Sequence, residues 1–319
     1  MQNIAQPDLN IIDIADLKPL PYVDSCITIG NFDGVHLGHQ AIIKRMLKSV
    51  QHQPHPLLVV TFYPNPYVYF NQPKRAFYLS TPNEKARFLM GLGVDEVITF
   101  RFDSAFANLT AEAFLLKLKH ALGLGTLIVG QDFALGKGRE GTIPVLKEIG
   151  RVHNFAVETI PYIAIGKEEI SSTTIRQYLD QGMVDGAAEL LGHPYSLTGE
   201  VSHGADRGAR IGLPTANITH WPHKKLPLVG VYATRVHLRG QVYQGVTNVG
   251  YRPTFEDQNQ VKVETHILDF DDNIYGETIR LDFLMKLRDE QKFSGIDAFL
   301  AQIERDKAKA RRIFADAEK

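Results

Sequence analysis

Two histidines lie in a glycine-rich segment, Gly30–His39 (GNFDGVHLGH), directly after the apolar stretch Cys26–Ile29. An apolar stripe at helical spacing begins a few residues later, so we expect His36 and His39 at the N-terminus of a helix. Free N–H groups and the positive end of the helix dipole favour an anion there, Gly38 leaves room for it, and the imidazoles can donate to it. The pattern predicts a phosphate site, with ordinary loop and capping histidines as the alternative.

A run of hydroxyl residues, Ser171–Thr174, precedes Arg176 and opens another expected helix. Capping uses one or two hydroxyls, whereas four of them followed by an arginine indicate a second anion cradle at a helix start. Structural capping alone is the alternative interpretation.

The segment Gly136–Gly141 (GKGREG) satisfies the GxGxxG pattern of dinucleotide-binding proteins. Five residues, Gln131–Leu135, separate it from the preceding expected strand, so the tight strand–glycine–helix turn of that fingerprint is missing. We therefore reject a dinucleotide site. Beside Asp132, the segment is expected to be a flexible basic loop that closes over phosphates, or a loop that is merely solvated.

The second half of the chain holds Pro214–Asn217 (PTAN) and the alternating stretch Val261–Leu268. In an extended segment Thr215 and Asn217 share a face and offer hard oxygen ligands that suit Mg²⁺, although a turn is the alternative. Glu264 lies on the polar face of its stretch, where it can accept a proton from a substrate hydroxyl or simply face water. No Walker A motif is present.

The elements needed to position these residues follow two patterns. From about residue 25 to 160, apolar runs of strand length alternate with segments at helical spacing, which is typical of an α/β unit with a parallel sheet. After a short helix ending at Gly192, alternating strands predict a small β-barrel, closed by a final helix along Ile296–Ile303. We place the domain boundary at Gly186, giving domains 1–186 and 187–319. The strands expected are Cys26–Ile29, Leu57–Phe62, Val94–Phe100, Thr126–Val129, Phe155–Ile160, Val231–Leu238, Gln241–Asn248, Val261–Leu268 and Thr278–Met285.

Composition limits the class of protein. The 319 residues carry 35 Lys and Arg against 36 Asp and Glu, a net charge of −1, which leaves no basic field for nucleic acid. The single cysteine, Cys26, excludes an internal disulfide or a multi-thiolate metal site. With no signal peptide or membrane-spanning stretch, we expect a cytoplasmic protein with small-molecule partners, and neither nucleic acid nor a membrane among them. The sequence does not indicate the oligomeric state.

The motifs GNFDGVHLGH, TFYPNP, GQDFALGKGREG and ISSTTIR, in this order, resemble the adenylyltransferase half of bacterial bifunctional riboflavin kinase/FAD synthetases. GLPTAN, GVYA, NVGYRPTF, VETHILDF and LRDEQKF resemble the riboflavin kinase module of the same family. The resemblance implies a Rossmann-like nucleotidyltransferase domain, followed by a six-stranded Greek-key barrel with a terminal helix. It also implies that riboflavin is phosphorylated to FMN and FMN adenylylated to FAD, with ATP and Mg²⁺ in both steps.

The resemblance also implies residue roles. His36 and His39 are expected to be catalytic in adenylyl transfer and Glu264 to be the general base for the riboflavin 5′-hydroxyl, while Thr215 and Asn217 hold the metal. Nucleotide-binding residues of the first half are expected to be Gly30, Phe32, Gly38, Asp132, Ser172, Thr173 and Arg176, and nucleotide- or flavin-binding residues of the second half are expected to be Gly204, Arg207 and Arg288.

Some positions depart from the family's pattern. Ala134 and Leu135 replace a bulkier or polar pair, and Ala209 stands where an arginine is usual, so Arg210 or Arg207 is left to make that phosphate contact. Ring contacts to the flavin stay open between Phe255, Tyr275 and Phe293, each of which also suits the barrel core. The rival functions are another HxGH nucleotidyltransferase fused to an unrelated barrel, and a flavin sensor without turnover.

Overall fold

The computed structural model describes residues 11–51, 55–161, 164–165, 168–203, 213–251 and 261–317. The chain divides into two compact units, Met1–Ser172 and Thr173–Lys319. This division precedes the boundary expected at Gly186, because α8 (Val184–Leu191) packs against barrel strands. The expected boundary stays a prediction for where the two activities separate.

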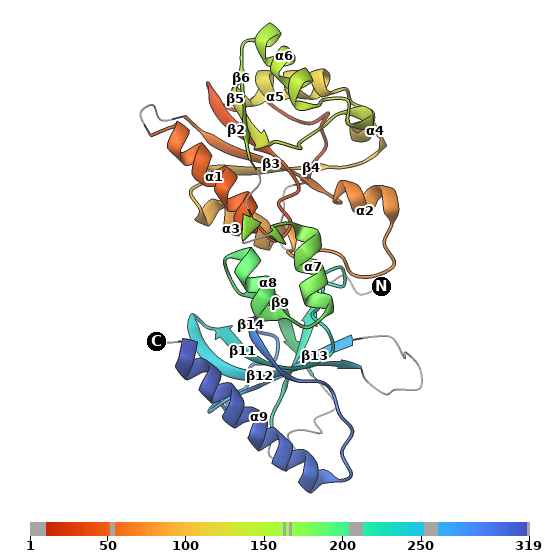
Figure 1. Ribbon diagram of the computed structural model, residues 1–319, viewed down its shortest axis with the longest axis vertical. Helices are drawn as coiled ribbons and strands as arrows, with labels where there is room; N and C mark the ends of the chain where they lie inside the picture. The colour runs from red at the N-terminus through yellow and green to blue at the C-terminus, as the bar shows by residue number, and fades with distance from the viewer. Residues whose placement is uncertain are drawn as a thin grey trace. The chain divides into compact units, whose positions relative to one another are not determined.

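The first unit is a six-stranded parallel sheet in the order β1-β4-β3-β2-β5-β6, with helices on both faces (Figure 1). Its strands are β1 (Ile11–Ile12), β2 (Ser25–Ile29), β3 (Leu57–Tyr63), β4 (Glu96–Arg101), β5 (Leu124–Gly130) and β6 (Ala156–Ile160), with a separate antiparallel pair β7 (Ala164–Ile165) and β8 (Glu168–Glu169). Its helices are α1 (Leu37–Ser49), α2 (Pro66–Asn71), α3 (Pro82–Gly91), α4 (Ser104–Ala107), α5 (Ala111–Leu122) and α6 (Ile143–His153). The α/β prediction is confirmed.

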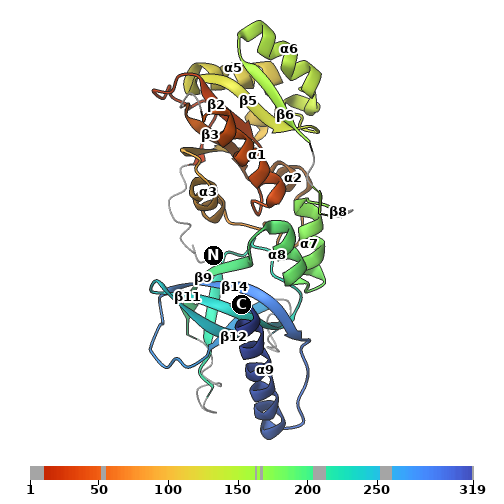
Figure 2. The ribbon, with the colours of Figure 1, turned by 60° about the vertical axis from the view of Figure 1, so that its left-hand side comes forward.

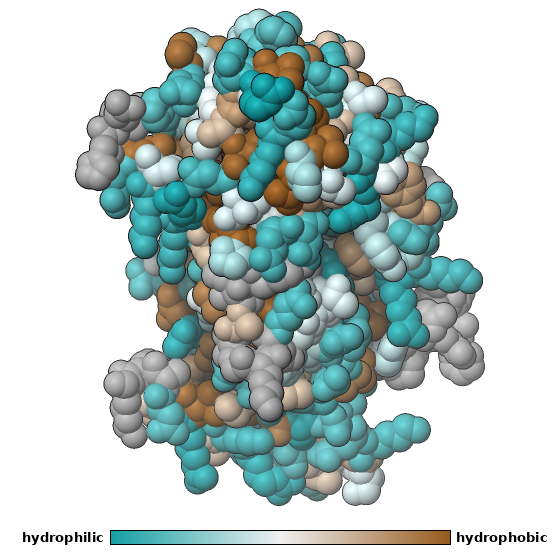
Figure 3. Space-filling model, turned by 45° about the horizontal axis from the view of Figure 1, so that its top comes forward, coloured by the Kyte–Doolittle hydropathy of each residue, from teal (hydrophilic) through white to brown (hydrophobic). Residues whose placement is uncertain are grey.

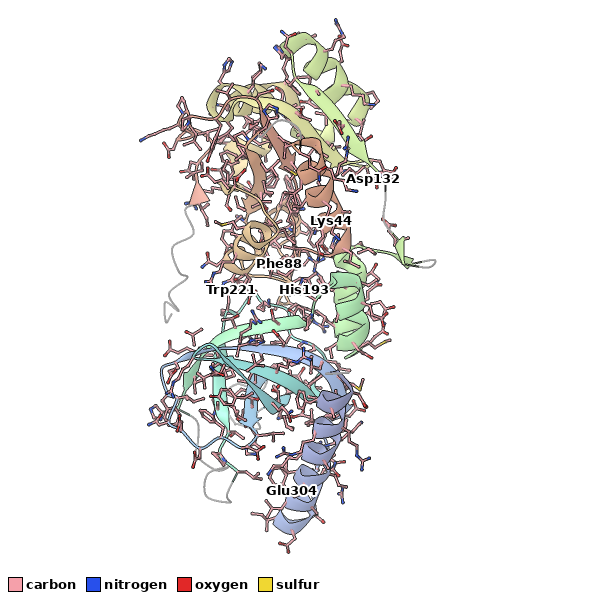
Figure 4. All side chains as sticks on the ribbon, turned by 90° about the vertical axis from the view of Figure 1, so that its left-hand side faces the viewer. Lys44, Phe88, Asp132, His193, Trp221 and Glu304 are labelled. Carbon is pink, nitrogen blue, oxygen red and sulfur yellow. The ribbon has the colours of Figure 1, made fainter. Side chains whose placement is uncertain are left out.

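Two apolar cores hold this sheet between its helix layers. On one face, Ile43 and Met46 of α1 and Leu89 of α3 pack against strand residues such as Val59. On the other face, α5 and α6 cover the sheet through a larger cluster that includes Leu118. Lys44 on α1 and Phe88 on α3 mark the first layer in Figure 4.

The second unit is a closed six-stranded barrel in the order β10-β13-β12-β11-β14-β9. Its strands are β9 (Tyr195–Ser202), β10 (Ala216–His220), β11 (Gly230–Leu238), β12 (Gln241–Tyr251), β13 (Val261–Ile267) and β14 (Thr278–Arg288). The neighbours β14-β11-β12-β13 form the Greek-key arrangement that we expected. Strands β9 and β10 are not among the strands expected from the sequence, although β9 alternates buried and less buried residues along its whole length.

Three helices accompany the barrel: α7 (Ser172–Asp180), α8, and α9 (Ile296–Ala317). Helix α9 lies along β12, β11 and β14, and Figure 2 shows it beside the barrel wall. Its buried residues Ala310 and Phe314 close the core formed by Val231 and Leu287. The expected terminal helix is confirmed.

The face of the molecule drawn in Figure 3 is mostly hydrophilic. Hydrophobic residues form small groups between the hydrophilic ones on this face. Within the described part of the chain, none of the helices combines the length and hydropathy needed to cross a lipid bilayer.

Candidate active sites

The loop between β2 and α1 lies at the switch point of the parallel sheet. Strand β2 pairs with β3 on one side and β5 on the other, and the strand order runs away from it in both directions. Open α/β sheets bind ligands outside the carboxyl ends of their strands at such a point. The loop after β5 leaves the same edge and carries Asp132, which Figure 4 labels.

His36 and His39 form a stacked pair at the start of α1. His36 is the N-cap residue, its side chain caps no helix N–H, and no acidic residue lies in the first turn. The two ring centroids are 3.6 Å apart at an interplanar angle of 21°. A Cβ on Gly38 would lie 3.1 Å from Nδ1 of His36, so the glycine also leaves space for this ring. The helix terminus is therefore available to an anion.

The protein environment keeps His39 neutral. Burial, with the charges of His36 and Lys85, holds the pKa of His39 well below its ordinary value. Its Nδ1 is buried and has no hydrogen-bond partner among the described residues. A neutral imidazole still donates one N–H, so the ring can bind phosphate oxygen without carrying a charge of its own.

Phe32 packs beside His39, and Gly30 leaves space for the Phe32 ring. Phe32 is only 1% exposed, and its ring centroid lies 4.9 Å from that of His39. A Cβ on Gly30 would lie 3.0 Å from the Phe32 ring. The buried Phe32 ring therefore packs beside the His39 ring. With its side chain buried, Phe32 can offer a ligand only its backbone groups.

Two residues that the sequence analysis did not single out, Asp33 and Lys85, fix this loop. The Asp33 carboxylate accepts hydrogen bonds from the backbone N–H groups of Leu79 and Ser80 at 2.9 and 3.1 Å. Lys85 donates to the carbonyl of Asn31 at 3.0 Å. The one sequence signal for Lys85 is a charged residue four positions before Leu89 on an otherwise apolar helix face.

Ser172 was expected in the nucleotide site, and its hydroxyl donates to the carbonyl of Asp33 at 2.9 Å. This bond joins Ser172 of the hydroxyl-rich motif to the loop between β2 and α1, residues 30–36, within the first unit. We call this segment the histidine loop. Thr173 and Arg176 lie on α7 in the second unit, so their part in the nucleotide site stays a prediction.

A recess opens beside the histidine loop, with aromatic rings, amides and carboxyl groups in its wall. It is lined by Asn31, Asp33, Phe62, Tyr63, Asn65, Tyr78, Ser80, Pro82 and Lys85. Burial raises the pKa of Tyr78 to about 12, so this phenol stays protonated, and its oxygen accepts a hydrogen bond from the Asn65 backbone N–H at 2.9 Å.

Backbone hydrogen bonds shape the basic loop after β5, and its expected closure over phosphates stays a prediction. Leu135 and Gly141 exchange backbone hydrogen bonds across it at 2.9 and 3.2 Å. Lys137 N–H donates to the carbonyl of Leu109 at 2.8 Å. Asp132 itself is exposed beside this turn, and backbone hydrogen bonds hold the loop in place because Gly136 and Gly138 accept positive φ angles of 82° and 64°.

The barrel carries a transverse row of polar residues. Asn217 on β10 lies opposite Glu264 on β13, and Glu264 lies opposite Asn248 on β12. On the other side Asn217 lies opposite Ser202 on β9. Directly opposed residues share a face, so one carboxylate, two amides and a hydroxyl converge on the same part of the barrel.

The opposite face of the same strands is the barrel interior. Thr234, Thr247 and Thr265 are fully buried there and linked by hydroxyl bonds of 2.7 and 2.9 Å. Thr265 and Thr247 are the chain neighbours of Glu264 and Asn248. This chain of hydroxyls fixes the strands so that the polar row faces away from the core.

The segment Pro214–Asn217 is extended rather than a turn. Thr215 and Asn217 alternate with buried Ala216, so the two expected metal ligands share a face. The ring of His266, two residues after Glu264 on β13, lies with its Nδ1 2.8 Å from the Pro214 carbonyl oxygen. This contact holds the Thr215 segment against the strand that carries the glutamate.

Arg288 has a partner that the sequence did not reveal. Its guanidinium donates to the Asp306 carboxylate of α9 at 2.9 Å, and it lies 5.7 Å from the Phe293 ring centroid. The pair ties β14 to α9. The expected flavin contact by Arg288 stays a prediction, and Gly204 and Arg207 lie outside the described residues, as do Ala209, Arg210 and Phe255.

Of the described flavin-ring candidates, Tyr275 is not core. It is 41% exposed, and its ring stacks on His203 with centroids 3.8 Å apart.

Glu290 is a further residue that the sequence motifs contained but we did not single out. A Cβ on Gly250 would collide with its carboxylate and lie 2.9 Å from Asn248 Nδ2, so Glu290 approaches the end of the polar row.

The fold and these two clusters define an enzyme that transfers phosphate groups at two sites. The family model for FAD synthetase matches residues 21–174, and the family model for riboflavin kinase matches residues 191–314. A bifunctional riboflavin kinase/FMN adenylyltransferase of Escherichia coli (strain K12) is 39% identical over 304 residues, which cover 94% of this chain and 96% of the relative. The chain belongs to the family of bifunctional riboflavin kinase/FMN adenylyltransferases.

Further relatives agree with this membership. The protein of the same description from Listeria monocytogenes is 36% identical over 299 residues, 93% of this chain and 94% of the relative. A crystal structure from Streptococcus pneumoniae, described as a macrolide-efflux protein, has a TM-score of 0.86 and 33% identity, covering 94% of this chain and 97% of its own.

Proposed function

We propose that the first unit transfers AMP from ATP to FMN, giving FAD and pyrophosphate, and that the barrel phosphorylates riboflavin to FMN. The observation that carries the proposal is the placement of the two polar clusters in separate compact units. The histidine pair belongs to the first unit, whereas Asn217 and Glu264 belong to the second. Each cluster then serves one reaction.

In the adenylyl transfer, a phosphate oxygen of FMN attacks the α-phosphorus of ATP and the bond to the β-phosphate oxygen breaks. Negative charge grows on the α-phosphoryl oxygens and the leaving pyrophosphate. The uncapped N–H groups of α1 and the N–H groups of His36 and His39 are placed to bind these oxygens. No covalent nucleophile is required, so positioning and charge stabilisation carry the rate.

We assign the second substrate of this step to the neighbourhood of the recess beside the histidine loop. Its aromatic side chains, Phe62, Tyr63 and Tyr78, offer faces for a flat ring, and Asn31 and Asn65 offer amides for the polar edge. Because Asn31 belongs to the histidine loop, a flavin bound there has its phosphate close to the α1 terminus.

In the kinase reaction, Glu264 accepts the proton of the riboflavin 5′-hydroxyl as that oxygen attacks the γ-phosphorus of ATP and ADP leaves. This proposal is supported by the partial exposure of Glu264 and its register with Asn217, because the proposed base and the proposed nucleotide ligand would then share one face. The sensor without turnover is disfavoured, since it has no need of a carboxylate at this position.

Mg²⁺ is part of the proposal. Thr215 and Asn217 provide hydroxyl and amide oxygens, and the Glu264 carboxylate shares their face, so the donor set suits a hard cation. Among the described residues no cluster of three or more His, Cys, Asp or Glu side chains is placed to hold a metal. The remaining ligands would be phosphate oxygens and water, and the ion would neutralise charge on the transferring phosphoryl group. A cytoplasmic location, where ATP is available, also belongs to this proposal.

The test is a product assay. Purified protein given riboflavin, ATP and Mg²⁺ is expected to form FMN and then FAD, separated by chromatography. Glu264→Gln should abolish FMN formation but leave FAD formation from supplied FMN, and His36→Ala should do the reverse. Loss of both activities in either variant would contradict two separate sites.

A further inference from the structure

Lys85 occupies a position that an apolar residue would normally fill. Helix α3 starts with a capping box in which Thr81 and Glu84 bond each other's backbone N–H groups, and this places Lys85 in the first turn. The side chain is 7% exposed and lies on the same face as fully buried Leu89. Burying an ammonium group is unfavourable, so hydrogen bonds that an apolar side chain cannot make must offset this cost.

The ammonium of Lys85 joins three parts of the first unit. Nζ donates to the Thr61 hydroxyl of β3 at 2.7 Å and to the Asn31 carbonyl of the histidine loop at 3.0 Å. The Thr61 hydroxyl in turn donates to the same carbonyl at 3.2 Å. The three groups form a closed triangle of hydrogen bonds between helix, strand and loop.

The loop that this triangle holds has a strained backbone. Phe32 and Val35 have positive φ angles of 50° and 42°, in the left-handed region that side chains disfavour, and for a β-branched valine this is an outlier. Such conformations persist only where surrounding contacts impose them. Asn31 precedes Phe32, and His36 follows Val35, so the contact at Asn31 controls where the histidines lie.

Burial also tunes the charge at this point. It lowers the pKa of Lys85 to about 8, against the opposing effect of Asp33, and the Lys85 charge helps to keep His39 neutral. The titratable groups that face the ammonium are therefore Asp33 from the loop and His39 from α1.

We propose that Lys85 is a positioning residue for the adenylyl transfer, and that it acts by holding the Asn31 carbonyl and Thr61 so that the strained loop presents His36 and His39 to the phosphates. This inference rests on the proposed function of the first unit. Nothing in it requires Lys85 to touch the substrate.

The experiment compares Lys85→Met with a matched pair at its partner, Thr61→Val and Thr61→Ser. We expect kcat for FAD formation from FMN to fall about 100-fold in Lys85→Met, as misplaced catalytic groups typically cost, with the KM for ATP changed less than about 5-fold. Thr61→Val should also lose kcat, whereas Thr61→Ser, which keeps the hydroxyl, should stay within about 3-fold of the parent. Riboflavin kinase activity of each variant is the internal control and should not change.

The outcomes separate this inference from the proposed function. A parent protein that forms no FAD from FMN and ATP refutes both. A parent that is active with a Lys85→Met variant of full kcat refutes the inference alone, as does a variant in which only the KM for ATP rises. If Lys85→Met does not fold, the threonine pair decides, because equal kcat in Thr61→Val and Thr61→Ser removes the hydrogen-bonded triangle from catalysis.

Discussion

Asn217 and Glu264 lie directly opposite each other on adjacent antiparallel strands of the barrel. Opposed residues of such a pair have Cβ atoms about 5 Å apart, so an amide oxygen and a carboxylate approach the same bound group. The sequence separates them widely, with the β11–β12 hairpin between. The barrel register alone brings the proposed nucleotide ligand next to the proposed base.

Replacing Asn217 tests the ligand half of this pair. Asn217→Ala removes the amide oxygen and should raise the KM for Mg·ATP in FMN formation by about 10-fold or more, which corresponds to about 1.4 kcal/mol of binding. Ser202→Ala, at the next position in the row, is the matched control and should change the KM much less. Kinetics at several Mg²⁺ concentrations measure the effect. Equal KM values in the two variants would remove Asn217 from the nucleotide site.

Gly38→Ala tests the histidine pair without removing a polar group. The added Cβ would lie 3.1 Å from Nδ1 of His36, closer than ordinary contact, so the His36 ring must shift and its stacking on His39 changes. We expect FAD formation to fall about 10-fold or more while FMN formation is kept. Gly91→Ala, where a Cβ meets nothing within 4 Å, is the control. Unchanged FAD synthesis in Gly38→Ala would show that the stacked ring geometry is dispensable.

The buried Lys85 predicts a pH-dependent stability. Its pKa is about 8 when folded and 10.5 ordinarily, so between these values the unfolded chain binds more protons and the free energy of unfolding rises with pH. Below pH 8 both states are protonated and the penalty is complete. Relative to Lys85→Met, the parent should gain on the order of 3 kcal/mol across the window.

Urea unfolding at several pH values, followed by circular dichroism, measures this difference. Trp221, the one tryptophan, lies in the second unit and reports barrel unfolding separately by fluorescence. Free-energy curves of parent and variant that run parallel from pH 7 to 10 would mean that Lys85 keeps its ordinary pKa.

The Arg288–Asp306 pair predicts a structural role at the end of β14. Asp306→Asn removes the charge from a carboxylate that is 3% exposed and leaves the guanidinium without its counter-ion, at a cost of about 2 kcal/mol in unfolding free energy. Asp269→Asn, which breaks the exposed Asp269–Arg311 pair between the same barrel and α9, should cost clearly less. Trp221 fluorescence in urea compares the two. A larger loss in Asp269→Asn would contradict the prediction.

The sequence predicted the parts of this fold that local pattern controls. The strands β2 to β6 and the helix α1 follow from apolar runs and three- and four-residue spacing, and the place of His36 and His39 at the start of α1 follows from the glycine-rich segment between β2 and α1. The proposed metal and base residues were singled out because Thr215, Asn217 and Glu264 lie at alternating positions in segments expected to be extended, and the antiparallel register of β10 and β13 brings Asn217 and Glu264 opposite each other.

Long-range partners could not be predicted in the same way. Nothing near Lys85 in the sequence points to Asn31 or Thr61, because the triangle depends on how α3 packs on the sheet. Arg288 and Asp306 likewise meet only once α9 lies on the barrel. The bond from Lys137 N–H in the basic loop after β5 to the Leu109 carbonyl also comes from another segment and left no signal in the sequence.

The polar row on the barrel also constrains how this protein can change in length. Side chains alternate along a strand, so deleting one residue from β13 would turn Glu264 into the interior and bring Thr265 out to the solvent face. Such a deletion would remove the carboxylate from the polar row and bury its charge in the barrel interior beside Thr247. Insertions and deletions are therefore expected to be tolerated in the hairpin turns and excluded from the strands that hold the row.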